Sequence, residues 1–188
     1  MTGRISEAIQ QDHNEIEACF EKIVHSSSRD EQTRFQTLFT WELARHLVGE
    51  EIVVFPALEK HLPDGRSMAD TNRKHHHHIK EQLKQFQSMS ASNVDFLRTL
   101  DSLMTTTLLP HMREEEANDL SKLEDVLSHH DSLKLAKAFS RTKIFAPSRS
   151  HPHVPDKPPF ETVVGLLAAP IDQLADLFRK WPHEGQPG

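Results

Sequence analysis

Histidines followed four residues later by a glutamate are the feature of this 188-residue chain best suited to chemistry. Residues four apart lie about one turn apart on the same face of an α-helix, so each pair points an imidazole and a carboxylate in one direction. With 14 histidines in the chain, chance alone predicts this spacing about once. It occurs four times, at His13/Glu17, His46/Glu50, His77/Glu81 and His111/Glu115.

Two of the four pairs fall on the apolar face of their helix. At about 100° per residue, His46 and Glu50 lie within the apolar sector of one predicted helix, and His111 and Glu115 lie within that of another. His13 lies on the apolar face of the first helix. We therefore expect these five side chains to point into the interior.

The remaining pairs are interpreted differently. His77 and Glu81 fall opposite Ile79 on the third helix, which predicts a solvent-exposed pair, and Glu17 lies at the edge of its face and is left out. His77 belongs to a run of four histidines, residues 75–78. Within it, His75 and His76 flank the apolar face about equally, so periodicity leaves them tied.

Inward imidazoles and carboxylates on several helices indicate a metal site. A single inward histidine is more often a hydrogen-bonded core residue, but burying two carboxylates and several imidazoles without a cation would cost several kcal/mol for each unpaired charge. Four imidazoles and two carboxylates exceed one tetrahedral zinc site, and mixed nitrogen and oxygen donors suit two adjacent first-row ions bridged by the carboxylates. The Glu-x-x-His motif of ferritin-like di-iron proteins occurs nowhere in the sequence.

Apolar residues recur at three- and four-residue steps along four stretches, which predict four long helices. The stretches run over about 5–23, 35–53, 68–86 and 97–115, and a shorter amphipathic piece follows at about 131–144. Pro56 is expected to bend the second helix, and Pro110 to kink the fourth just ahead of His111. Short connections between long helices predict an all-α, up-down-up-down four-helix bundle.

Prolines divide the chain. Eight of the 11 lie at or after Pro147, so we expect a bundle domain over 1–145 and a Pro-rich C-terminal extension over 146–188. Within that extension, a short terminal helix is predicted to begin at Pro170.

Composition excludes several classes of protein. A net charge of −6 without a basic stripe argues against a nucleic-acid binder. No run of apolar residues is long enough to span a membrane, and the N-terminus shows no signal core. The single cysteine, Cys19, cannot form an internal disulfide, so a reducing, cytoplasmic setting is expected.

The sequence resembles the haemerythrin-like (HHE cation-binding) family over about residues 5–128. The matching segments are Asp12-His-Asn-Glu-Ile16, His46-Leu-Val-Gly-Glu-Glu-Ile-Val-Val-Phe-Pro56, His76-His-His-Ile79 and His111-Met-Arg-Glu-Glu-Glu116. The segment from His46 to Pro56 is the most specific of them. This resemblance implies a bundle around an oxo- or hydroxo-bridged centre of two iron ions. It implies terminal ligands at His13, His46, His76 and His111 and bridging carboxylates at Glu50 and Glu115. His75 is the alternative ligand on the third helix.

The chain departs from the oxygen-carrying members of that family. They have a second histidine one turn before the histidine of the third helix, where this chain has Asn72, and their fourth-helix carboxylate is an aspartate at five residues instead of Glu115 at four. With fewer imidazoles among the metal ligands, coordination positions on the metal stay open. This puts simple reversible oxygen carriage in doubt and favours reaction with oxygen or peroxide.

Three functions follow from this reading. The leading one is a non-haem di-iron protein that binds or reacts with dioxygen, peroxide or nitric oxide. The second is an oxidase or oxygenase acting on a small organic substrate, which requires a pocket that reaches the metals. The third is an iron-binding or sensing module without catalysis.

Overall fold

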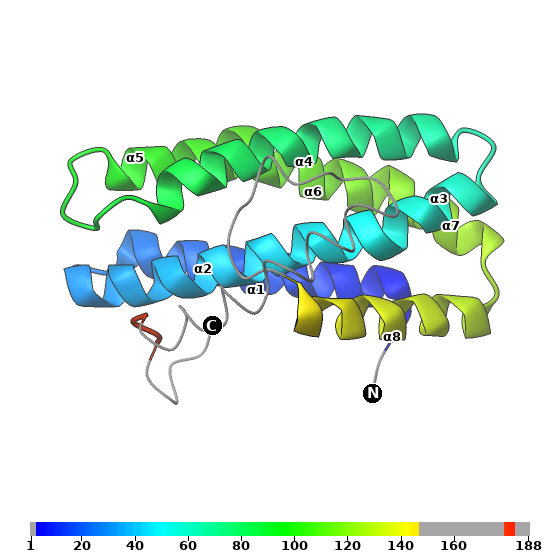
Figure 1. The fold of residues 1–188 in the computed structure, drawn as a ribbon, viewed down its shortest axis with the longest axis horizontal. Coiled ribbons are helices and arrows are strands. Elements are labelled where there is room, and N and C mark those ends of the chain that lie inside the picture. Colours follow the sequence, from blue (N-terminus) through cyan, green and yellow to red (C-terminus); the bar gives the residue numbers. More distant parts are fainter. Residues whose placement is uncertain (1–2, 147–178, 183–188) are drawn as a thin grey trace.

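A computed structural model describes residues 3–146 and 179–182, and these residues form a bundle of helices (Figure 1). The helices are α1 (Ile5–His25), α2 (Arg29–Gly49), η1 (Glu50–Val54), α3 (Phe55–His61), α4 (Gly65–Gln87), α5 (Phe96–Asp101), η2 (Ser102–Leu108), α6 (Leu109–Glu114), η3 (Glu115–Leu120), α7 (Ser121–Val126) and α8 (His129–Phe145). The three η elements are π-helical turns. No strand occurs in the described parts of the chain, and the prediction of an all-α helical bundle is confirmed.

Four long helical rods make up the bundle. They are α1, the continuous run α2–η1–α3, α4, and the continuous run α5–η2–α6–η3–α7. Neighbouring rods meet where α1 packs on α2, α3 packs on α4, and α4 packs on η2. The predicted helix at about 131–144 is observed as α8, which packs against α1, α2 and η1 (Figure 1). The predicted helix beginning at Pro170 lies outside the described residues.

Local signals set several helix boundaries. Ser28 caps α2 by accepting a hydrogen bond from the Glu31 backbone N–H, and Ser128 caps α8 in the same way from Asp131. At Gly65, which begins α4, a Cβ would lie 1.9 Å from the Leu58 carbonyl oxygen. The turn between α3 and α4 therefore requires a glycine, because no side chain fits there.

The two prolines inside the rods each follow a π-helical turn. The Phe55 N–H, just before Pro56, donates to the Glu50 carbonyl five residues back, and the Leu109 N–H, just before Pro110, donates to that of Met104. A proline ring clashes with the carbonyl four residues back and offers no N–H. Where a bend was predicted, the helix thus widens into a π turn, a rare feature of helices that occurs frequently at functional sites.

The apolar core is split into two clusters by a polar layer. Along α1, Ile9 belongs to one cluster and Ile16 to the other, with His13 between them; along α4, Ala69 and Ile79 are divided in the same way by His76. The helices thus carry apolar residues on both sides of a central set of polar ones. Among the described residues, no helix has the length and apolarity needed to cross a membrane.

Candidate metal centre

Six of the predicted side chains meet in the polar layer of the bundle. All are buried, with exposed fractions of 5% or less, and they come from all four rods. They are His13 on α1, His46 on α2, Glu50 on η1, His76 on α4, His111 on α6 and Glu115 on η3. The structure therefore brings together side chains that lie as much as 102 residues apart in sequence.

Two overlapping groups of these side chains are close enough to hold a cation. The ligand atoms of His13, His46, Glu50 and Glu115 lie within 4.8 Å of one another, and so do those of Glu50, His76 and His111. Glu50 belongs to both groups because its two oxygens face different imidazoles: Oε1 lies 3.1 Å from His46 Nε2, and Oε2 lies 3.1 Å from His76 Nε2. One carboxylate is thus shared by the two groups.

Most of the inward-facing atoms lack hydrogen-bond partners among the described residues; the exceptions are His13 Nε2 and His46 Nε2, which lie 3.1 Å from each other. Both oxygens of Glu50, both oxygens of Glu115, and the Nε2 atoms of His76 and His111 are buried without one. At Glu50, the nearest imidazole nitrogens lie 3.1 Å from the carboxylate oxygens without forming a hydrogen bond. Buried polar atoms left unpaired are costly, and a cation is the partner that this donor set accepts. The residues present fit a metal centre.

Three of the four histidines are oriented from behind by carboxylates. His13 Nδ1 lies 2.6 Å from Glu116 Oε1, His46 Nδ1 lies 3.3 Å from Asp12 Oδ2, and His76 Nδ1 lies 3.0 Å from Glu51 Oε1. A carboxylate accepts a hydrogen bond from Nδ1–H, so that in a neutral ring the Nε2 lone pair is the one available to a metal. This is the carboxylate–histidine–metal arrangement found around metal ligands in proteins.

Burial and mutual charge shift the pKa values of several clustered side chains. Burial and the neighbouring Glu50 carboxylate raise the pKa of Glu115 well above its ordinary value of 4.5. Burial alone would raise the pKa of Glu50 too, but the His46 and His76 imidazoles hold it well below its usual range. Burial and the neighbouring His76 lower the pKa of His111 to about 3. Without a cation, these shifts favour the protonated form of Glu115 and the charged form of the His46 and His76 imidazoles beside Glu50.

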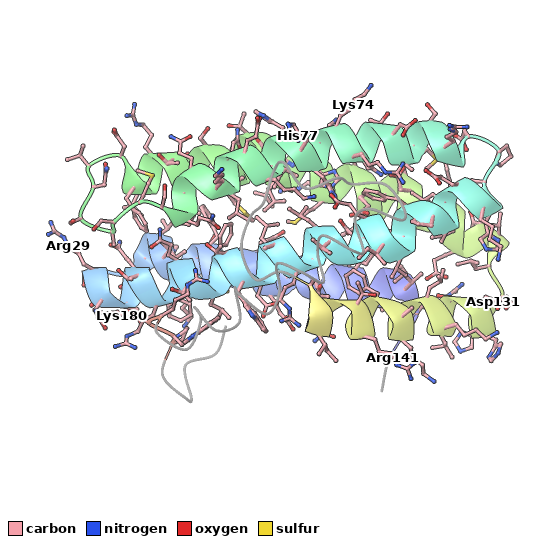
Figure 2. All side chains as sticks on the ribbon, in the orientation of Figure 1. Arg29, Lys74, His77, Asp131, Arg141 and Lys180 are labelled. Carbon is pink, nitrogen blue, oxygen red and sulfur yellow. The ribbon has the colours of Figure 1, made fainter. Side chains whose placement is uncertain are left out.

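The histidine run on α4 is divided by the structure. His76 is fully buried and belongs to the cluster, whereas His75 is exposed and packs the edge of its ring against His111, at 5.6 Å between ring centroids. His77 lies on the outer side of α4 (Figure 2), about half exposed, with Nε2 3.6 Å from Glu81. His76 and not His75 faces the other predicted ligands.

Asn72 and Glu17 also have defined places. Asn72 is buried one turn before His76 and donates a 2.6 Å hydrogen bond from Nδ2 to Asp119 Oδ2. Its side chain is thus engaged outside the cluster. Glu17 is exposed on α1.

The sequence analysis missed the residues behind the histidines. Asp12 and Glu51 each adjoin a predicted ligand in the sequence, and Glu116 follows Glu115. A search for residues four apart does not reach them, because a neighbour in sequence points about 100° away on a helix. The doublets Asp12-His13, Glu50-Glu51 and Glu115-Glu116 were the available signal.

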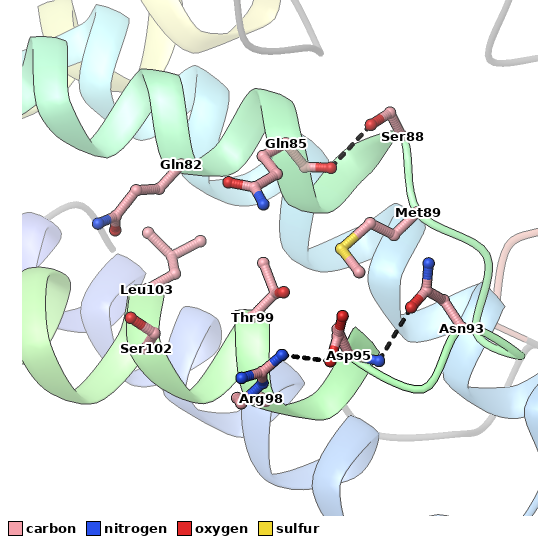
Figure 3. Close-up of a pocket in the computed structure, with 10 residues that line it drawn as sticks. All are labelled: Gln82, Gln85, Ser88, Met89, Asn93, Asp95, Arg98, Thr99, Ser102 and Leu103. Carbon is pink, nitrogen blue, oxygen red and sulfur yellow. Dashed lines mark hydrogen bonds and ion pairs between the residues drawn. The ribbon is translucent and has the colours of Figure 1, made fainter.

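Two of the cavities bounded by the described residues lie beside the bundle and are lined by other side chains. One, of about 610 Å³, is lined by polar side chains such as Gln82, Gln85 and Thr99 where α4 ends and α5 begins (Figure 3). The other, of about 240 Å³, lies between α1 and α7 and includes Glu116 and Glu124. None of the six clustered side chains lines either cavity.

Comparison with known proteins agrees with this geometry. A family model described as "Hemerythrin HHE cation binding domain" matches residues 4–133. A protein of Schizosaccharomyces pombe described as an uncharacterized hemerythrin-like protein is 50% identical over 180 residues, which cover 95% of this chain and 88% of that protein. No solved structure gives a significant match.

Proposed function

Because the chain belongs to the haemerythrin HHE cation-binding domain family, we propose that its clustered side chains hold two iron ions that bind or react with dioxygen, peroxide or nitric oxide. Family membership and the buried His/Glu groups indicate a metal-binding protein. The identity of the metal, the number of ions and the reacting molecules are the proposal. Its main support is the set of buried, unpartnered donor atoms on Glu50, Glu115, His76 and His111.

The sharing of Glu50 favours two ions over one. His13 and His46 face Glu50 from one side and His76 and His111 from the other, which gives each position two imidazoles. Glu115 lies in the group of His13, with its Oε2 3.6 Å from His13 Nε2. Nitrogen and carboxylate donors in this mixture suit first-row transition metals such as iron.

The protein's own residues would bind, orient and shield the metals. Glu50 would be a ligand of both ions, and Asp12, Glu51 and Glu116 hold the imidazole rings of His46, His76 and His13 from the outer side. Phe55 packs against His76 and Phe139 against His46, at 4.9 and 6.0 Å between ring centroids, so apolar rings limit access of water. When bound, iron supplies Lewis acidity and redox chemistry.

The donor set is small for two ions, and this supports the proposal that a small molecule would bind there. Four imidazoles and two carboxylates leave coordination positions open. Asn72, at the place of a further histidine in the oxygen carriers, is bonded to Asp119 instead. An organic substrate would require a pocket that reaches the metals, and the two cavities described above are not lined by the clustered side chains. We propose that this activity takes place in the cytoplasm, a reducing compartment that suits a chain whose only cysteine is Cys19.

Anaerobic iron loading tests the proposal. Adding ferrous iron to metal-free protein is expected to give two irons per chain, and exposure to air or nitric oxide is expected to change the visible absorption spectrum. Glu50→Ala removes the shared carboxylate and should lower the iron content, whereas Glu17→Ala, an exposed control, should not. Zero or one iron per chain in the wild-type protein would refute the proposal.

A further inference from the structure

A lysine of α8 reaches the back of the candidate metal centre. Lys143 Nζ lies 2.5 Å from both carboxylate oxygens of Asp12, and Asp12 in turn faces His46 Nδ1. Asp12 is buried, and the Lys143 side chain is only 15% exposed. Asp12 therefore stands between a cationic side chain and a candidate ligand, and it holds the imidazole from behind.

A second lysine repeats this arrangement on the other side of the cluster. Lys80 Nζ lies 2.6 and 2.7 Å from the two oxygens of Glu51, and Glu51 Oε1 faces His76 Nδ1. Lys80 is 8% exposed and Glu51 is 2% exposed. Lysines are almost never buried to this degree unless they are paired, so the pair is built into the core.

The two arrangements serve different cation positions. His46 belongs to the group that also contains His13, and His76 belongs to the group that contains His111; the groups share Glu50. The carboxylate behind His13 differs, since Glu116 is one-third exposed and contacts the Gln10 amide. Each position thus has one imidazole supported by a buried lysine–carboxylate pair.

We propose that the pairs Asp12–Lys143 and Glu51–Lys80 are matched positioning elements, one for each metal, that orient His46 and His76 and limit the negative charge that the carboxylates place behind them. This inference rests on the proposed function. A bare carboxylate behind an imidazole makes the ring a stronger donor. A lysine bonded to both of its oxygens neutralises that charge in a poorly solvated interior, where electrostatic effects are large.

The proposal predicts shifts of opposite sign from the two members of each pair. Lys80→Met and Lys143→Met leave a carboxylate uncompensated, which stabilises oxidised iron and should lower the reduction potential. Glu51→Gln and Asp12→Asn leave a lysine uncompensated, which should raise it. If the pairs only stabilised the fold, the lysine and carboxylate variants would not shift the reduction potential in opposite directions, because each variant breaks the same ion pair.

The experiment measures the reduction potential of anaerobically iron-loaded protein and, separately, its affinity for cobalt(II). The carboxylate variants are expected to weaken cobalt binding roughly 10- to 100-fold, the loss typical of outer partners of metal ligands. Lys80→Arg should retain the wild-type potential, and the double variant Glu51→Gln/Lys80→Met, which removes both charges, should return close to it. The double variant also keeps the test open where a single variant fails to fold.

Exposed lysines on the same helices provide matched controls. Lys84→Met on α4 and Lys137→Met on α8 change the same charge at exposed positions and should leave potential and affinity unchanged. Potentials that do not move in the pair variants, or that move in the same direction for the lysine and the carboxylate, overturn this inference alone. A wild-type protein that binds no iron overturns the proposed function, and this inference with it.

Discussion

Glu115→Gln should stabilise the metal-free protein while removing its stabilisation by metal. Glu115 is 1% exposed, and burial together with the adjacent Glu50 raises its pKa well above 4.5. In the unfolded chain the same carboxyl ionises near its ordinary pKa, so folding at pH 7 favours protonation of Glu115. Glutamine has nearly the same shape and needs no proton.

The size of the effect is set by the pH. Neutralising a carboxyl with an ordinary pKa of 4.5 at pH 7 costs about 3 kcal/mol, at about 1.4 kcal/mol for each pH unit. This is the largest gain that Glu115→Gln can give to the metal-free protein at pH 7. The pKa of Glu115 is higher in the folded protein than in the unfolded chain. The free-energy cost of protonating it on folding is therefore absent below pH 4.5 and grows as the pH rises. Wild-type and variant proteins should therefore be equally stable near pH 4.5.

Urea unfolding at pH 4.5 and pH 7, with a chelator and with ferrous iron under anaerobic conditions, measures both effects. A ligand that binds only the folded state stabilises it, so wild-type protein should gain stability from iron and the variant should gain much less. Glu114→Gln alters the exposed neighbouring residue and should change stability by less than about 0.5 kcal/mol. The reasoning is refuted if metal-free Glu115→Gln is no more stable than wild type at pH 7, or if its advantage persists at pH 4.5.

Three further predictions concern packing, reactivity and pH. In Gly49→Ala the new Cβ would lie 2.7 Å from the Phe139 ring, so α8 must shift and unfolding should become easier by about 1–3 kcal/mol; Phe139→Leu in the same protein should recover part of this loss. Burial raises the pKa of the Cys19 thiol to about 12, so a thiol reagent at pH 8 should label it only in unfolded protein, and rapid labelling of native protein would contradict this. Burial would lower the pKa of His46, but Glu50 and Asp12 raise it to about 9. Metal must displace that proton, so affinity should rise with pH toward 9 and calorimetry should detect proton release, whereas a flat profile would count against it.

Much of the fold and the core of the candidate centre could be predicted from helical periodicity. His13 shares the face of Ile9 and Ile16, and a step of four residues places Glu50 beside His46; both relations hold wherever the backbone is helical. The run of histidines shows the limit of this reasoning. His75 and His76 flank the apolar face equally by periodicity, and only the packing of α4 against its neighbours makes His76 the buried one.

The π-helical turns and the lysine pairs could not be predicted in this way. A π turn changes the angular phase of all residues after it, and periodicity assumes a constant phase; two of these turns begin at Glu50 and Glu115 themselves. Lys143 and Asp12 are 131 residues apart, and the helix that carries Lys143 lies outside the four-helix pattern. A buried lysine is also contrary to ordinary residue preferences, so a sequence pattern assigns it to the surface.

The lysine pairs bear on how much charge the metals must balance. The two outer carboxylates, Asp12 and Glu51, are each matched by one lysine, so those four residues together contribute no net charge. Glu50 and Glu115 remain as the inner carboxylates without a lysine partner among the described residues. In metal-free protein their charge is met by protons, on Glu115 itself and on imidazoles beside Glu50. Under the proposed function, divalent ions would replace those protons while the outer pairs stay in place.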